Sequence, residues 1–187
     1  MVGMRAIHIG SLDGPSAAEL VEIDEPAAVE GTVVVEVHAA GVAFPDALQS
    51  RGLYQYKPDL PYVPGAEIAG VVRSAPDGAH VRQGDRVAGL TMLSGAMAEV
   101  VALQPERVFA LPDAVSFEAG AGLLFNDLTV HFALRTRGRL REGETVLVHG
   151  AAGGIGTSTL RLASAFGAAR TIAVVSTDAK AEVARAA

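Results

Sequence analysis

Two observations predict a mixed fold, with an all-β barrel or sandwich followed by the start of an α/β domain. Residues 4–110 contain many short runs of β-branched and apolar residues separated by glycine and proline, as in β-barrels and sandwiches. After residue 113, apolar residues recur at helical spacing, and a strand, a glycine-rich loop, a helix and a second strand then follow. The chain has 187 residues, half of them hydrophobic, which suits one domain or two small ones.

The composition excludes several classes of protein. The net charge of −6 argues against a nucleic-acid partner, which requires a basic face. The sequence contains no cysteine, so it forms no disulfide and offers no thiolate to a metal. No run approaches the roughly 20 apolar residues of a membrane span, and the first residues lack the apolar segment of a signal peptide. We therefore expect a cytoplasmic protein that does not bind membranes.

Six strands are expected in the first part of the chain, each bounded by turn-forming residues. They are residues 4–9, 32–42, 67–75, 85–90, 97–103 and 107–111. A short helix is expected to begin near Pro45 and Asp46, because proline suits the first turn of a helix.

The second part is expected to consist of helices and two parallel strands. Residues 116–138 have helical spacing, with Ser116 as the N-cap and Gly138 as the stop, and either one helix or two would fit this pattern. The remaining expected elements are strands at 145–149 and 171–175 and helices at 157–167 and 178–187. Asp178 is a candidate N-cap of the last helix.

The loop 148-VHGAAGGIG-156 carries so little side chain that either the backbone turns tightly or a ligand approaches it closely. Between a strand and a helix, it resembles the G-x-G-x-x-G fingerprint of dinucleotide-binding proteins, aligned here on Ala151, Gly153 and Gly156. Gly153 lets the backbone approach a pyrophosphate, Gly156 lets the helix pack close to the strand, and the helix start offers free N–H groups to phosphates. The candidate cofactor ligands are Ala152, Gly153, Gly154, Ile155 and Gly156. A tight turn without a ligand is the alternative.

The end of the second strand indicates which dinucleotide would bind. NAD-binding folds carry an Asp or Glu about 20 residues beyond the glycines, where it holds the ribose 2′-OH. Ser176 and Thr177 stand there instead and Lys180 follows, while Asp178 comes late for that role. Hydroxyl groups and a cation suit a 2′-phosphate, so we expect NADPH rather than NADH. A solvated lysine at a helix start is the alternative for Lys180.

Five separated segments match one known family in the same order along the chain. They are residues 41–72, 82–90, 105–123 and 139–156, and 174-VVSTDAK-180. Through them the chain resembles the zinc-independent quinone oxidoreductases of the medium-chain dehydrogenase/reductase superfamily. The resemblance implies a GroES-like β-barrel catalytic domain at residues 1–125 and the N-terminal part of a Rossmann NADP-binding domain at residues 126–187. It also implies an NADPH-dependent homodimer that reduces a quinone or another α,β-unsaturated carbonyl (an enone, for example).

The resemblance further implies roles for single residues. Asn126 and Thr129 lie where the family's helix start contacts the nicotinamide, with helix capping as the alternative. Tyr54 matches a tyrosine that resembling enoyl reductases use near the nicotinamide, so it is the candidate catalytic proton donor. An ordinary loop tyrosine is the alternative for Tyr54, and Tyr56 is a weaker substitute. Asp46 is expected to cap or orient the loop that precedes it.

Two positions depart from related enzymes. Zinc-dependent relatives have a His-Glu pair after a glycine, but 65-GAE-67 has Ala66 in the histidine position. Without that histidine or any cysteine, a zinc site of the usual kind is excluded by ligand chemistry, so we expect no metal. Ala43 stands where the family commonly has asparagine, which suggests a more apolar substrate.

Only two of the about six strands that a doubly wound sheet needs are expected in the second part. The chain is therefore expected to be the N-terminal part of a longer protein, with an apolar sheet face left uncovered. An enoyl-thioester or other double-bond reductase is the alternative enzyme. A truncated binding or assembly module without turnover is the non-enzymatic alternative.

Overall fold

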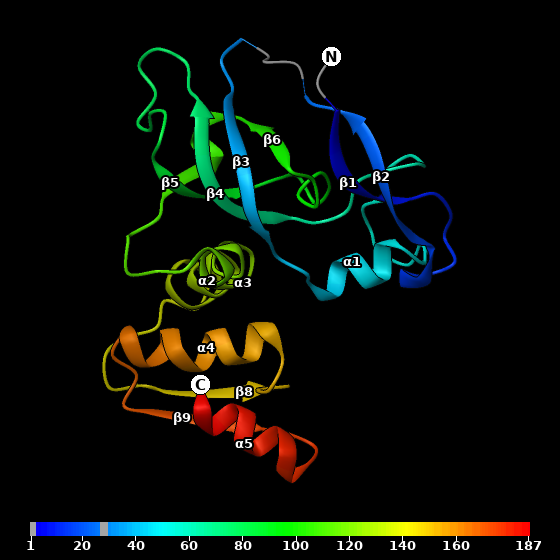
Figure 1. Ribbon diagram of the computed structural model, residues 1–187. Helices are drawn as coiled ribbons and strands as arrows, with labels where there is room; N and C mark the ends of the chain where they lie inside the picture. The colour runs from blue at the N-terminus through cyan, green and yellow to red at the C-terminus, as the bar shows by residue number, and fades with distance from the viewer. Residues whose placement is uncertain (1–2, 27–29) are drawn as a thin grey trace. The chain divides into compact units, whose positions relative to one another are not determined.

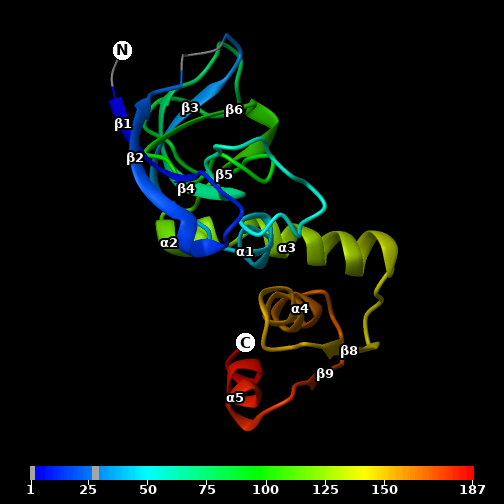
Figure 2. The same cartoon turned by 90° about the vertical axis from the view of Figure 1, so that its right-hand side faces the viewer.

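The computed structural model describes residues 3–26 and 30–187, and it divides into two compact units, Met1–Leu124 and Phe125–Ala187. The first unit is built mainly from antiparallel strands, and the second from a parallel strand pair with helices (Figures 1 and 2). The mixed fold class that the sequence predicts is therefore confirmed, with an antiparallel β part followed by an α/β part that has two parallel strands.

A five-stranded antiparallel sheet, in the order β6-β3-β4-β5-β7, forms most of the first unit. Its strands are β3 (Val33–Ala40), β4 (Glu67–Ser74), β5 (Arg86–Leu90), β6 (Val100–Leu103) and β7 (Val108–Ala110). Their β-branched side chains suit a pleated, half-buried surface. In β4, a Cβ atom on Gly70 would lie 1.9 Å from the Glu36 carbonyl oxygen, so this close approach of β3 requires a glycine.

A separate antiparallel hairpin joins β1 (Gly3–Ile9) to β2 (Ala18–Asp24). The sequence does not predict β2, because most of its side chains are exposed and three are acidic, which weakens the apolar alternation. The expected strand at 97–103 is too long, since β6 begins only at Val100. Before that point the chain pairs with β1 instead: the Ile7 N–H donates to the Met97 carbonyl at 2.9 Å, and Ala98 bridges to Ala6.

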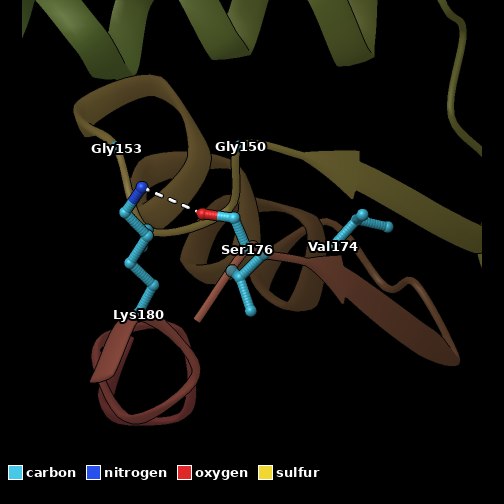
Figure 3. Close-up of a pocket in the computed structure, with 7 residues that line it drawn as sticks. Gly150, Gly153, Val174, Ser176 and Lys180 are labelled. Carbon is cyan, nitrogen blue, oxygen red and sulfur yellow. Dashed lines mark hydrogen bonds between the residues drawn. The ribbon is translucent and has the colours of Figure 1, made fainter. Parts of the chain in front are cut away.

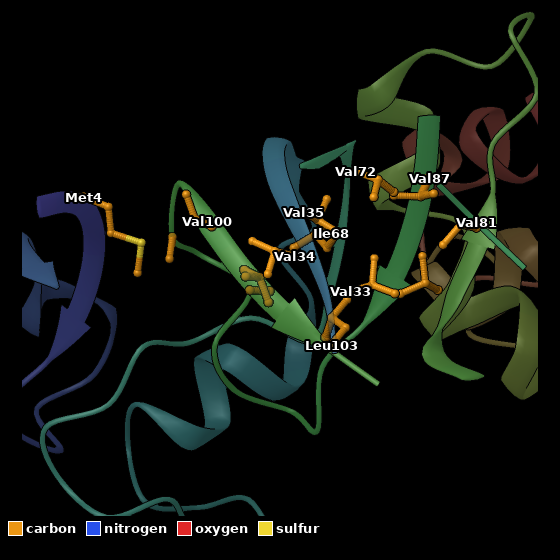
Figure 4. Packing of buried hydrophobic residues seen from close by; sticks show 14 of the residues in the cluster. Met4, Val33, Val34, Val35, Ile68, Val72, Val81, Val87, Val100 and Leu103 are labelled. Carbon is orange, nitrogen blue, oxygen red and sulfur yellow. The ribbon is translucent and has the colours of Figure 1, made fainter. Parts of the chain in front are cut away.

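Side chains from several strands of the sheet form the core of the first unit. Figure 4 shows Val33, Val35, Ile68 and Val87 among the residues that pack there, and all four are fully buried. Complete burial of an aliphatic side chain of this size contributes about 1.5–3 kcal/mol to stability. The apolar runs of the sequence therefore form the strands whose buried side chains stabilise the first unit.

The helical segment after residue 113 is not one continuous α-helix. It forms α2 (Phe117–Ala121), α3 (Leu124–His131) and a π-helical stretch, Phe132–Arg137. The predicted N-cap is confirmed, because the Ser116 hydroxyl accepts the Ala119 N–H at 3.2 Å. Gly122 ends α2, and Gly138 follows the π-helical stretch as the expected stop.

Two parallel strands and two helices make up the rest of the second unit. They are β8 (Thr145–His149), α4 (Gly154–Ala165), β9 (Arg170–Val174) and α5 (Asp178–Ala186). The predicted start of α4 at residue 157 is wrong by three residues. Gly153 is the extended N-cap, and the Thr157 N–H donates to its carbonyl at 2.8 Å, so Gly154 already lies in the helix.

The strand pair of the second unit is covered by side chains on one side only. Val148, Ala151, Leu160 and Ala184 pack together from β8, the following loop, α4 and α5. Leu147, which alternates with Val148 along β8, is 54% exposed, as expected for an uncovered apolar face. Among the described residues, no helix combines the length and the apolarity that crossing a lipid bilayer requires.

Candidate functional site

A cavity of about 500 Å³ lies where the glycine-rich loop, the end of β9 and the start of α5 meet (Figure 3). Its lining residues are Gly150, Ala152, Gly153, Val174, Val175, Ser176 and Lys180. The only polar side chains in this lining belong to Ser176 and Lys180, and the Lys180 Nζ donates to the Ser176 Oγ at 3.1 Å. The cavity therefore presents a cation and a hydroxyl beside exposed backbone.

The loop turns so tightly because of its glycines. Gly150 has a φ of +63°, in the left-handed region that favours glycine. Its carbonyl accepts the Gly153 N–H at 2.9 Å, and the Ala151 N–H donates to the Val174 carbonyl of β9 at 3.2 Å. A Cβ atom on Gly156 would lie 2.4 Å from the Gly150 carbonyl oxygen, so α4 can pack against the loop only with glycine there.

The five predicted loop ligands differ in how they face the cavity. Ala152 and Gly153 line it, whereas Gly154 and Ile155 are exposed in the first turn of α4, and Gly156 is buried beneath the loop. The first N–H groups of a helix have no acceptor within it, and the helix dipole makes this end positive. Gly150 also lines the cavity and is absent from the predicted set, because the fingerprint was aligned on Ala151.

Of the residues predicted to bind the cofactor beyond β9, some line the cavity and one does not. Ser176 and Lys180 reach the cavity, but Thr177 does not line it. The Thr177 hydroxyl accepts the Lys180 N–H at 3.3 Å and caps α5. Thr177, and not Asp178, is therefore the N-cap, and the prediction of Asp178 in that role is wrong.

Asn126 and Thr129 both lie on α3. The Asn126 side chain covers the start of α4, because a Cβ atom on Gly154 would lie 2.8 Å from the Asn126 Nδ2. Thr129 is exposed, and its hydroxyl donates to the Phe125 carbonyl at 2.6 Å within the helix. The structure thus places Asn126 beside the glycine-rich loop, while the Thr129 hydroxyl is used for a local hydrogen bond.

Sequence reasoning missed Asp127, which also contacts α4. Its carboxylate accepts from the Ser158 hydroxyl and from the Arg161 Nη2, the latter at 3.1 Å. A hint is present in the sequence, since Asp127 interrupts the apolar run of α3. The partners stand more than 30 positions further on, so the pattern alone does not identify them.

Tyr54 lies in the first unit, in the turn region after α1 (Phe44–Gln49). Its side chain is half-buried, whereas Tyr56 is 43% exposed. No three histidine, aspartate or glutamate side chains converge as metal ligands within the described part of the chain.

Asp46 orients the loop in front of α1, as predicted. Its buried carboxylate accepts the Ala43 N–H at 2.7 Å and the Gly65 N–H at 3.1 Å. Burial raises the pKa of this carboxyl group, and its backbone hydrogen bonds oppose that rise. The position of the 41–46 loop therefore depends on a buried acid.

The fold and the cavity together define a class of protein. An antiparallel first unit is followed by a strand–glycine turn–helix–strand unit, in which the helix N-terminus and a Lys–Ser pair border a cavity. A strand–glycine turn–helix–strand unit of this kind is characteristic of a dinucleotide-binding Rossmann segment.

Comparison with known proteins agrees with this class. Residues 29–113 match the family of the alcohol dehydrogenase GroES-like domain. A quinone oxidoreductase from Rattus norvegicus is 38% identical over 88% of this chain and 50% of its own length. The chain is therefore similar to the alcohol dehydrogenase GroES-like domain over residues 29–113, and the relatives that it matches include quinone oxidoreductases, in agreement with the resemblance that its sequence carries.

Solved structures show the same relationship. The crystal structure of a probable oxidoreductase from Mycobacterium abscessus has a TM-score of 0.93 and 44% identity, covering 99% of this chain and 59% of that one. The quinone oxidoreductase from Thermus thermophilus, also determined in complex with NADPH, has a TM-score of 0.84 and 37% identity, covering 98% and 57%. The chain thus spans about half the length of the curated relatives that it matches.

Proposed function

We propose that the second unit binds NADPH at the cavity beside the glycine-rich loop. The observation that carries this proposal is the Lys180–Ser176 pair, with 3.1 Å between Nζ and Oγ, at the edge of the loop. A lysine ammonium and a hydroxyl are good donors to a phosphate oxygen. The related Thermus thermophilus enzyme, determined in complex with NADPH, supports the same cofactor here.

The residues present fit the parts of this nucleotide. The backbone of Gly153 and the free N–H groups at the start of α4 suit a diphosphate. Lys180 and Ser176 suit the 2′-phosphate that distinguishes NADPH from NADH. Gly153 adds no side chain to the cavity, so a ligand can approach the backbone closely.

For the enzymatic activity, we propose reduction of a quinone or another α,β-unsaturated carbonyl without zinc. NADPH, when bound, supplies the hydride. Tyr54 is proposed as the proton donor to the reduced product, through its phenolic O–H. The absence of cysteine, and Ala66 in place of a histidine, support a reaction that uses no zinc ligand of the usual kind. The two units would then act as the catalytic domain and as part of the cofactor-binding domain.

Two other functions are distinguished by experiment. An enoyl-thioester or double-bond reductase would share the nucleotide site and Tyr54, so turnover of quinones compared with enoyl thioesters separates it from the leading proposal. A binding or assembly module would bind NADPH without oxidising it. Homodimerisation and a cytoplasmic location stay predictions.

The first test is a paired titration of the chain with NADPH and NADH. Lys180→Ala is expected to weaken NADPH binding about tenfold or more and to leave NADH binding unchanged, because a hydrogen bond to a charged group is worth about 1.5–3 kcal/mol. The matched control is Lys57→Ala, since Lys57 is the other lysine of the chain and is exposed in the first unit. Equal affinity for NADPH and NADH, or no binding of either nucleotide, would contradict the proposal.

The second test concerns the proton donor. Tyr54→Phe is expected to lower kcat about 100-fold in the quinone-reducing protein, since a positioned acid contributes about 10²–10⁴-fold, and to leave the Kd for NADPH unchanged. Tyr56→Phe is the control, because it removes a hydroxyl of the same kind two residues away. Equal kcat values for the two variants would show that Tyr54 is an ordinary loop tyrosine.

A further inference from the structure

We propose that Asp127 is a positioning residue for the nucleotide site. By binding Ser158 and Arg161 of α4, it holds α3 so that the Asn126 carboxamide covers the start of α4 and completes the diphosphate-binding end of the site. This inference rests on the proposed binding of NADPH to the second unit, and it assigns a task to a contact that the sequence does not predict.

The contact of Asp127 with Ser158 of α4 is largely enclosed, whereas the Arg161 side chain is 53% exposed. Ser158 is 1% exposed and the Asp127 side chain is 17% exposed. One carboxylate oxygen of Asp127 receives both the Ser158 hydroxyl and the Arg161 Nη2. A carboxylate that is mostly removed from water is costly unless it is paired and hydrogen-bonded, so this arrangement selects one placement of α3 on α4.

The neighbouring residue, Asn126, then lies at the start of α4. Its Nδ2 is so close to Gly154 that a Cβ atom there would be 2.8 Å away. The cavity lining follows the chain from Gly150 to Gly153 and includes Lys180 at its other side. A dinucleotide that extends from Lys180 along the loop therefore passes Gly153 and next reaches Gly154 and Asn126.

Charge explains why Asp127 contacts α4 and Asn126 lies at the phosphate end of the site. Asp127 itself would repel a phosphate, but its partners Ser158 and Arg161 lie four and seven residues after Gly154 in α4. At 1.5 Å per residue, these partners are about 6 and 10 Å from the helix start along its axis. The acid is thus set back from the phosphate end and paired with Arg161, while the neutral Asn126 amide, which can donate two hydrogen bonds, lies at that end.

The test uses two probes of different length, NADPH and adenosine 2′-monophosphate, on the full chain. Adenosine 2′-monophosphate carries the 2′-phosphate for Lys180 but no diphosphate. Asn126→Ala is expected to weaken NADPH binding about tenfold and to leave adenosine 2′-monophosphate binding unchanged. Lys180→Ala is expected to weaken both.

A double-mutant cycle shows whether Asp127 acts through Asn126. Asp127→Asn is expected to weaken NADPH binding about fivefold in the native chain and less than twofold in the Asn126→Ala background, because residues that act together are not additive. Ser158→Ala is a second variant that removes only the buried hydroxyl, and its effect should also disappear in that background. Thermal unfolding of each variant reports whether it is folded.

The outcomes separate this inference from the proposed function. The positioning role is overturned, and the nucleotide site stands, if the native chain binds both probes but Asp127→Asn and Ser158→Ala leave the affinity for NADPH unchanged. The same conclusion follows if these two substitutions weaken NADPH binding by the same factor in the native chain and in the Asn126→Ala background. If the native chain binds neither probe, the proposed function falls, and this inference falls with it.

Discussion

At the scale of single residues, Asp46 shows how one buried acid determines the path of a loop. Its two oxygens bind the N–H groups of Ala43 and Gly65, which are 22 positions apart in the sequence. Desolvation is the larger influence on this carboxyl group and raises its pKa above the ordinary value. The folded protein therefore holds the Asp46 proton to a higher pH than the unfolded chain does.

We expect this shift to appear in the pH dependence of stability. Because the folded pKa is raised, the stabilisation due to Asp46 is complete below about pH 4 and is lost as the pH rises through the folded pKa. Asp46→Asn removes that dependence. The difference in free energy of unfolding between the native protein and Asp46→Asn should therefore be largest at low pH and shrink as the pH rises. Urea unfolding at several pH values measures this, with Asp77→Asn, an exposed acid, as the control. A difference that is constant with pH would contradict the prediction.

Contacts between residues that are close in sequence are the ones that the sequence can indicate. Lys180 follows Ser176 by four positions, and the structure brings the two side chains to one cavity. The predicted cap of α5 differs from the observed one by one position, because Thr177 and Asp178 are both good N-cap residues and only the backbone geometry decides between them. Asp127 was missed since its partners lie on another helix.

At the scale of elements, the strand–loop–helix turn depends on two glycines for different reasons. Gly156 is buried, and a Cβ atom there would overlap the Gly150 carbonyl oxygen at 2.4 Å. Gly153 lines the cavity, and a Cβ atom there would approach that same oxygen only to 3.4 Å, an ordinary contact. Gly156 is therefore needed for packing, and Gly153 leaves room for a ligand.

These two glycines make a matched pair of variants. Gly156→Ala is expected to lower the free energy of unfolding by about 2–3 kcal/mol, as overpacking of a tight contact does. Gly153→Ala is expected to change stability by less than about 1 kcal/mol and to weaken NADPH binding, because the added methyl group enters the cavity. Chemical unfolding and nucleotide titration of both variants check this. A stable Gly156→Ala, or unchanged binding by Gly153→Ala, would contradict the assignment.

Element boundaries were predictable where residue types change sharply. The bounds of β8 match the predicted strand, since Gly150 follows its apolar run directly. The predicted start of α4 is three residues late, because glycines disfavour helix in isolation, whereas close packing against the loop makes Gly154 and Gly156 helical here. β2 escaped prediction because its partner strand, and not burial of its own side chains, holds it in place.

At the scale of the whole molecule, each of the two compact units has its own buried cluster. The residues proposed to bind the phosphates of NADPH all lie in the second unit, on α3, the loop after β8, the start of α4, the segment after β9 and the start of α5. Tyr54, the proposed proton donor, lies in the first. Phosphate binding and proton donation are thus assigned to different units.

Hydrogen exchange tests where the nucleotide binds. NADPH is expected to slow amide exchange most strongly within residues 145–180, because ligand binding stabilises the structure that forms the site. Strands β3, β4 and β5 should change little by comparison. The Lys180→Ala variant is the control, and it should show little protection at the same NADPH concentration. Stronger protection in the first unit would place the phosphate site elsewhere.

The sequence by itself determined the class of fold, the strand–glycine loop–helix order and the nearness of Lys180 to Ser176, because these depend on neighbours along the chain. Only the tertiary structure decided the contact of Asp127 with Ser158, the cover of Gly154 by Asn126 and the pairing of β2. The physical reason is that these features arise from packing between separate elements, where burial and close approach outweigh the local preference of each residue.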